Sequence, residues 1–115
     1  MILKIKKRDG RIVDFNSEKI FQVIWKAAQS VGGENQEKAR FLTKEVINLL
    51  EEKYKNQIPA VEDIQDIVEK VLIEQGHAQT AKSFILYRQK RKEIRGAKKL
   101  MGIEDDTKFS LNALK

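Results

Sequence analysis

Three consecutive cations run into a tight turn near the start of the chain, in residues 6–10 (KKRDG). The helix expected just after them begins at Asn16, a residue type that caps helix N-termini, and carries Lys19 at its third position. Lysine is electrostatically unfavourable there, because the unpaired N–H groups of a first helical turn already create positive potential. A cation placed against this dipole indicates an anionic occupant. Together with Lys7 and Arg8, the helix start predicts a phosphate pocket.

Other classes of site have little support. Cations at a hairpin tip most often only keep a protein soluble, which is the competing interpretation of this cluster. The phosphate-binding loop G-x-x-x-x-G-K-[ST] is absent, so a phosphate would be bound by another device. The chain has no cysteine and one histidine, His77, which excludes thiolate metal sites and cysteine nucleophiles and leaves little for a histidine metal centre or a Ser-His-Asp triad.

A second cluster is the acidic stretch at residues 61–69 (VEDIQDIVE), expected to open a helix. Its carboxylates Glu62, Asp66 and Glu69 share a stripe that should face solvent, so a charged outer face is a better interpretation than a metal or acid/base cluster. Gln65 lies one position beyond a core-facing residue, and its amide can donate and accept hydrogen bonds to a base or a ribose.

The net charge of +6 is concentrated at the two ends of the chain. Residues 1–11 carry five basic side chains and one acidic, and residues 82–99 carry eight basic and one acidic, whereas residues 12–81 carry eight basic and twelve acidic. If folding brings the ends together, they form one positive surface suited to nucleic acid, a nucleotide or an acidic protein. The alternative is two solvated basic faces that never meet.

The elements that must position these residues follow from the patterning of the 115-residue chain. Residues 2–7 and 11–15 flank Asp9-Gly10 and predict a hairpin, and residues 56–60 could add a short third strand at the sheet edge. Helical periodicity predicts four helices, the first from Asn16 to the Gly32-Gly33 stop and the second over about 35–54. The third runs from 61 to a stop at Gly76, and the fourth from about 78 to the mid-90s. One α+β domain is expected, a four-helix bundle capped by a small sheet.

Composition and hydropathy limit the fold and the cellular location expected for this domain. Hydrophobic residues make up 41% and charged residues 35%, which is enough apolar surface for a core and argues against general disorder. The apolar runs are far shorter than the roughly 20 residues of a membrane span. The N-terminus also lacks the apolar region and cleavage site of a secretory signal. A cytoplasmic domain without membrane contact is the expectation.

Four blocks of the sequence, taken in order, resemble the ATP-cone, the regulatory nucleotide-binding domain at the N-terminus of many ribonucleotide reductases. The resemblance spans about residues 3–95. A bacterial transcriptional repressor of reductase genes carries the same domain. The blocks are Lys7-Arg8-Asp9-Gly10, then Phe15 with Lys19 and Ile20, then residues 61–69, and then residues 81–88 followed by Arg91.

The resemblance implies a small sheet over four helices and an allosteric role, in which ATP permits reductase activity and dATP shuts it down. Mg²⁺ is expected to share the charge of the triphosphate. Val13 stands where some members place Glu to read the adenine, and Gln65 where some have His, so main-chain contacts would substitute there. The positions that the resemblance assigns to the nucleotide are Ile5, Lys7, Arg8, Asn16, Lys19, Val61, Gln65 and Lys90.

The last residues extend the resemblance beyond the cone. Residues 110–115 (SLNALK) are similar to the opening of a reductase catalytic domain, most like the adenosylcobalamin-dependent class. This implies an ATP-cone over residues 1–98, then a linker and the start of a truncated catalytic domain over 99–115. The chain itself is then expected to be non-catalytic, with adenosylcobalamin bound in the missing part. The partners implied are ATP or dATP, the remainder of the reductase chain and a further copy of the protein.

Two other functions compete with this interpretation. The first is a basic nucleic-acid-binding or transcription-regulating module that uses the last helix, whose residues 87–92 (YRQKRK) could neutralise phosphates of a polynucleotide or of a triphosphate equally well. The second is an enzyme that hydrolyses ATP. The missing phosphate-binding loop and the lack of a credible general base count against it.

Overall fold

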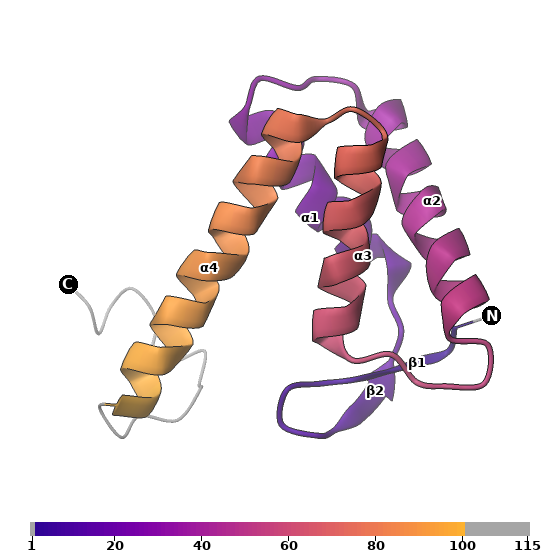
Figure 1. Ribbon diagram of the computed structural model, residues 1–115, viewed down its shortest axis with the longest axis vertical. Helices are drawn as coiled ribbons and strands as arrows, with labels where there is room; N and C mark the ends of the chain where they lie inside the picture. Colours follow the sequence, from indigo (N-terminus) through magenta and orange to yellow (C-terminus); the bar gives the residue numbers. More distant parts are fainter. Residues whose placement is uncertain (1, 101–115) are drawn as a thin grey trace. The chain divides into compact units, whose positions relative to one another are not determined.

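The computed structural model describes residues 2–100, which form two strands and four helices (Figure 1). This arrangement confirms the α+β class and the predicted order of hairpin and helices. Residues 101–115, which include the stretch that resembles a catalytic domain, lie outside the described residues. In chain order the elements are β1 (Lys4–Lys6), β2 (Ile12–Asp14), α1 (Ser17–Ser30), α2 (Gln36–Lys53), α3 (Val61–Glu74) and α4 (Ala78–Leu100).

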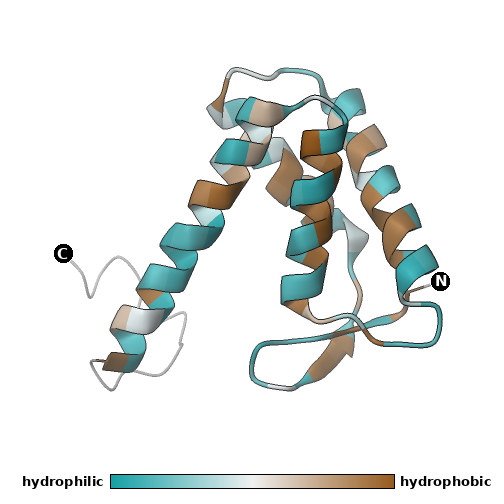
Figure 2. Ribbon diagram, in the orientation of Figure 1, coloured by the Kyte–Doolittle hydropathy of each residue, from teal (hydrophilic) through white to brown (hydrophobic). Residues whose placement is uncertain are grey.

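The chain divides into two compact units within α4, the first ending at Phe84 and the second starting at Ile85. The first unit holds the sheet, α1, α2, α3 and the first two turns of α4. The described part of the second unit is the remainder of α4 up to Leu100, which is mostly hydrophilic (Figure 2). The core and the site described below belong to the first unit.

The core of the first unit is formed by the apolar faces of its helices (Figure 2). Helical spacing of isoleucine, leucine and valine puts one face of α1, α2 and α3 inward, and α4 adds Ala81 and Phe84. The hairpin covers one end of this core, where Ile5 and Phe15 pack against it. The largest side chains that are less than 2% exposed are Phe84, Ile24, Leu50, Leu72, Val46 and Pro59.

The hairpin is antiparallel, with Ile5 opposite Val13, and its strands are joined by a short loop. The Lys7 N–H donates to the Arg11 carbonyl oxygen at 2.8 Å, so residues 8–10 form a three-residue loop. Gly10 closes it with φ +91°, a conformation that other residues rarely adopt. The carboxylate of Asp9 accepts from the Arg11 N–H at 3.0 Å, which holds the loop in shape.

The predicted third strand is wrong for residues 2–100. Residues 56–60 contribute a single parallel bridge between Lys6 and Ala60, and the sheet has two strands. The Pro59 carbonyl oxygen accepts from the Lys6 N–H, but Pro59 has no N–H to donate back to β1. The Ala60 N–H points away from β1 in this pairing and donates to the Asp63 carboxylate at 3.0 Å, and the chain turns there into α3.

The glycines predicted as helix stops act as such. Gly76, with φ +81°, follows α3 and donates its N–H to the Ile73 carbonyl oxygen, while the His77 N–H donates to that of Leu72 at 2.8 Å. The same pair of bonds, from Gly32 and Gly33, ends α1. His77 therefore links two helices, since its own carbonyl oxygen accepts from Ala81 in α4.

Two phenylalanines that differ in their exposure to solvent provide a matched test of the core. Phe84 is 1% exposed and Phe41 is 48% exposed. Phe84→Ala is expected to lower the free energy of unfolding by about 3–5 kcal/mol, because it opens a cavity in the core. Phe41→Ala, the same chemical change on the surface, should lower it by under about 1 kcal/mol. Urea denaturation of both variants measures the difference, and equal losses would contradict the core assignment.

Candidate functional site

The starts of two helices, α1 and α3, lie at the hairpin (Figure 1). The Phe15 N–H donates to the Leu3 carbonyl oxygen at 2.9 Å, one residue before the cap of α1. The Lys6 N–H donates to the Pro59 carbonyl oxygen at 3.0 Å, one residue before the cap of α3. The dipole of α3 thus presents its positive end near the loop that carries Lys7 and Arg8, which makes this place suited to an anion, whereas α1 starts beside the opposite, open end of the hairpin.

Arg8 reaches across from the hairpin loop to the first turn of α3. Its Nη2 lies 2.8 Å from Oε1 of Glu62 and 3.3 Å from the side-chain oxygen of Gln65. Two residues from distant parts of the sequence, both predicted to face the nucleotide, are therefore in direct contact. The Arg8 side chain is 34% exposed, so a ligand can reach it.

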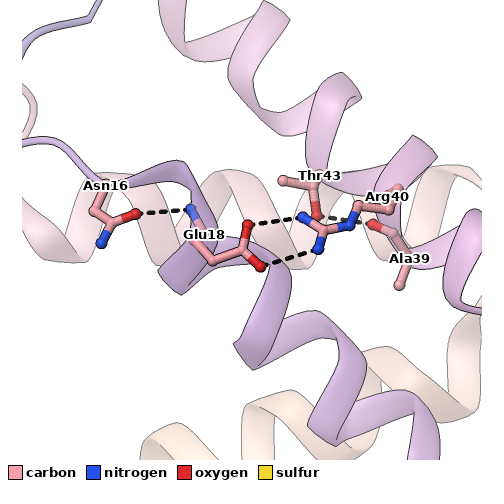
Figure 3. Close-up of polar contacts among 5 residues, drawn as sticks. All are labelled: Asn16, Glu18, Ala39, Arg40 and Thr43. Carbon is pink, nitrogen blue, oxygen red and sulfur yellow. Dashed lines mark hydrogen bonds and ion pairs between the residues drawn. The ribbon is translucent and has the colours of Figure 1, made fainter.

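The first turn of α1 is closed by its own cap (Figure 3). The Asn16 side-chain oxygen accepts from the Glu18 N–H at 3.0 Å, and its backbone oxygen accepts from the Lys19 N–H at 3.2 Å. These two amides are already used, so a phosphate at this helix start would meet the dipole and the exposed Lys19 rather than these N–H groups. The Asn16 amide nitrogen is the group through which this residue could contact a phosphate.

Glu18 in the same turn is paired with Arg40 of α2 (Figure 3). The two guanidinium nitrogens lie 2.8 and 3.0 Å from the two carboxylate oxygens, a bidentate pair that holds the pKa of Glu18 below its usual value. Arg40 also lies over the Phe21 ring, 3.6 Å from its centroid, and Phe21 stacks on Trp25. This cluster fixes α1 against α2.

The other predicted nucleotide residues occupy several positions. Ile5 is half-buried against the core, Lys7 is half-buried at the base of the loop, and Val61 is the first residue of α3 and half-buried. Lys90 is an exposed residue of α4 beyond Phe84, in the second unit. Its participation in the site stays a prediction.

Two residues of the site were not predicted. Glu62 was assigned to a solvent-facing stripe, yet it is the ion-pair partner of Arg8. The signal was present in the sequence, because Glu62 and Gln65 are three apart and share one helix face. Asp63 caps α3. Burial of the Tyr54 phenol raises its pKa, and the negative charge of Asp63 raises it further.

Residues 2–100 contain no group of three or more histidine, cysteine, aspartate or glutamate side chains placed to hold a metal ion. Within the same range, no helix has the length and apolarity needed to cross a bilayer. A cavity of ≈ 240 Å³ lies elsewhere in the first unit, lined by Ile24, Leu42, Lys38 and His77 among others. None of the predicted nucleotide residues lines this cavity.

Comparison with known proteins agrees with the geometry at the hairpin. A family profile described as the ATP cone domain matches residues 3–93. The chain is 43% identical over 120 residues to a vitamin B12-dependent ribonucleoside-diphosphate reductase of Thermoplasma acidophilum, covering 100% of the chain and 15% of that protein. It is 38% identical to a reductase of the same description from Mycobacterium tuberculosis, over 96% of the chain and 16% of that protein. A ribonucleoside-diphosphate reductase subunit alpha of Chlamydia muridarum is 35% identical over 81% of the chain and 10% of its own length.

The pair of Glu18 and Arg40 makes stability depend on pH. Because Arg40 lowers the pKa of Glu18 in the folded protein, the pair stabilises fully above the ordinary glutamate pKa of about 4.3. That contribution is lost as the pH falls through the lower, folded value. Glu18→Gln should therefore be less stable than the wild type at neutral pH, and the gap should close in acid. Chemical denaturation at several pH values measures this, with Glu37→Gln, at the equivalent position of α2, as the control. A gap that is independent of pH would contradict the assignment.

Asp63 should hold the start of α3 in place. Asp63→Ala removes the acceptor of the Ala60 N–H and is expected to lower the free energy of unfolding by about 1 kcal/mol. Asp63→Asn keeps an oxygen acceptor at this place and should lose less. Urea denaturation compares the two, and equal losses would show that charge, rather than the hydrogen bond, is what Asp63 contributes.

Proposed function

The chain belongs to the ATP-cone family, and from this premise we propose that it is a regulatory domain that binds ATP or dATP at the hairpin end of its first unit. The observation that carries the proposal is the contact of Arg8 with the first turn of α3. It joins the basic loop to Gln65, and these two segments are separate in the sequence. A nucleotide held between them would contact both.

The charges around this place suit a triphosphate. Lys7, Arg8 and Lys19 come from the hairpin loop and the first turn of α1, and the dipoles of α1 and α3 add positive potential. We expect Lys90 to add a further cation from α4. Mg²⁺ is expected to arrive with the nucleotide, since it is bound largely through phosphate oxygens and water and needs few protein ligands.

The uncharged part of the nucleotide has its own expected contacts. Ile5 on β1 and Val61, one turn before Gln65 on α3, offer half-buried apolar surface, and the Gln65 amide can donate and accept hydrogen bonds. We expect the base and ribose to lie on this side, at the start of α3. Asn16 would contact a phosphate through its amide nitrogen, because its oxygen caps α1.

The wider role depends on the parent protein. The chain spans about one sixth or less of the length of the curated relatives it matches. We propose that residues 1–98 form the regulatory domain of a ribonucleotide reductase, that residues 99–115 lead into a catalytic domain, and that any adenosylcobalamin binds there. Control requires that ATP and dATP bind two states of the parent with different affinity. Self-association and a cytoplasmic location belong to the same proposal.

Calorimetric titration of the 115-residue chain tests the proposal. ATP and dATP should each give saturable binding, and Lys7→Ala and Lys19→Ala should each weaken it by roughly tenfold or more, because each removes a charge expected to contact phosphate. Lys26→Ala is the matched control, since it removes the same charge from a later turn of α1. A DNA duplex should give no comparable signal. Salt-sensitive duplex binding without triphosphate binding would overturn the proposal in favour of a nucleic-acid-binding module.

A further inference from the structure

Two carboxylates hold equivalent places at the two helix starts of the site, and each is paired with an arginine from another element. Glu18 is the second residue of α1 and pairs with Arg40, and Glu62 is the second residue of α3 and pairs with Arg8. A carboxylate at this position is favourable for the helix itself. It is unfavourable for a neighbouring phosphate, so the two pairs bear directly on how an anion is accepted.

The two pairs differ in how firmly they are held. Arg40 makes two short bonds to Glu18 and stacks on the Phe21 ring, so its guanidinium is fixed on several sides. Arg8 makes one contact of 2.8 Å to Glu62 and a longer bond of 3.3 Å to Gln65, both through the same nitrogen. The Glu62 side chain is 54% exposed and that of Glu18 is 49% exposed, so the two pairs differ in geometry rather than in exposure. Solvent screens such a pair, and its net contribution to stability is small, so exchange for another anion costs little.

We propose that Glu62 occupies Arg8 in place of a phosphate when the site is empty, and that the triphosphate displaces it. This inference rests on the proposed function, since it concerns the same nucleotide site. A triphosphate carries several negative charges and bonds a guanidinium in a bidentate manner, so it outcompetes a single exposed carboxylate. Glu62 thereby sets the affinity of the site. Its carboxylate lowers the apparent affinity for every anion, and weakly charged ligands are the least able to displace it.

The exchange changes the contact between hairpin and helix. In the structure the loop tip is joined to α3 through Arg8, while the backbone bond from Lys6 to Pro59 joins the end of β1 to the segment just before α3. When Arg8 turns to the phosphates, Glu62 is released and Gln65 is freed for the nucleotide. The ligand then joins the loop tip to α3, so binding changes the contacts of both segments.

The test compares Glu62→Gln with the wild type in the full 115-residue chain. Glu62→Gln keeps the size of the side chain, removes its charge and should bind ATP roughly three- to tenfold more tightly in calorimetry, because Arg8 no longer has a charged competitor. Glu74→Gln is the matched control, since it removes the same charge from the last residue of α3. It should leave the affinity for ATP unchanged.

A second measurement follows Arg8 itself. The side-chain Nε–Hε resonance of Arg8 in a ¹⁵N spectrum should differ between wild type and Glu62→Gln without ligand, and the two should converge when ATP saturates the site. If Glu62 only stabilises the fold, the difference between the two Arg8 resonances should persist when ATP saturates the site.

The outcomes separate this inference from the proposed function. If the wild type binds ATP and Glu62→Gln binds it no more tightly than Glu74→Gln does, the exchange is wrong and the proposed function stands. If neither the wild type nor Glu62→Gln binds ATP, the proposed function fails, and the inference fails with it.

Discussion

One backbone hydrogen bond, from the Lys6 N–H to the Pro59 carbonyl oxygen, determines where the hairpin lies against α3. A two-stranded hairpin is marginal in water, and this one is further supported by the packing of Ile5 and Phe15 on the core. With β1 bound to β2 on one edge and to Pro59 on the other, the loop has a fixed place. The contact of Arg8 with the first turn of α3 depends on this placement.

Electrostatic balance explains how two helix starts and a basic loop coexist without a ligand. Each dipole end is met by a carboxylate of its own first turn, Glu18 in α1 and Glu62 in α3, and each carboxylate by an arginine from elsewhere. The positive potential is therefore offset in part within the protein. A net charge of +6 would otherwise suggest a general surface for polyanions, whereas this local pairing favours an anion that can compete for a particular arginine.

Local signals in the sequence were sufficient for most of the fold. Asn16 predicted the start of α1, Gly76 the end of α3, and Asp9-Gly10 the hairpin loop, because each is a short-range preference of cap or turn geometry. The third strand was wrong because Pro59 has no N–H to donate to β1 and α3 begins two residues later, at Val61. The start of a helix so close to Pro59 cannot be read from strand propensity.

The site was predictable in part, and for a related reason. Residue chemistry singled out Arg8 and Gln65, resemblance to a family assigned both to the nucleotide, and the structure places them in contact. Glu62 was assigned to solvent because helical periodicity tells which residues face away from the core, and not which element lies opposite them. Lys90 belongs to the part of α4 beyond Phe84, and its place in the site remains a prediction.

The shared bonds of Arg8 have a consequence for the way this domain evolves. Glu62 and Gln65 both contact one nitrogen of Arg8, so the effect of a substitution at any of the three depends on the other two. Substitutions in the loop at residues 7–10 and in the helix start at residues 61–65 should therefore co-vary between lineages. A domain that carries the loop of one lineage and the helix start of another would combine groups that were never selected to pair.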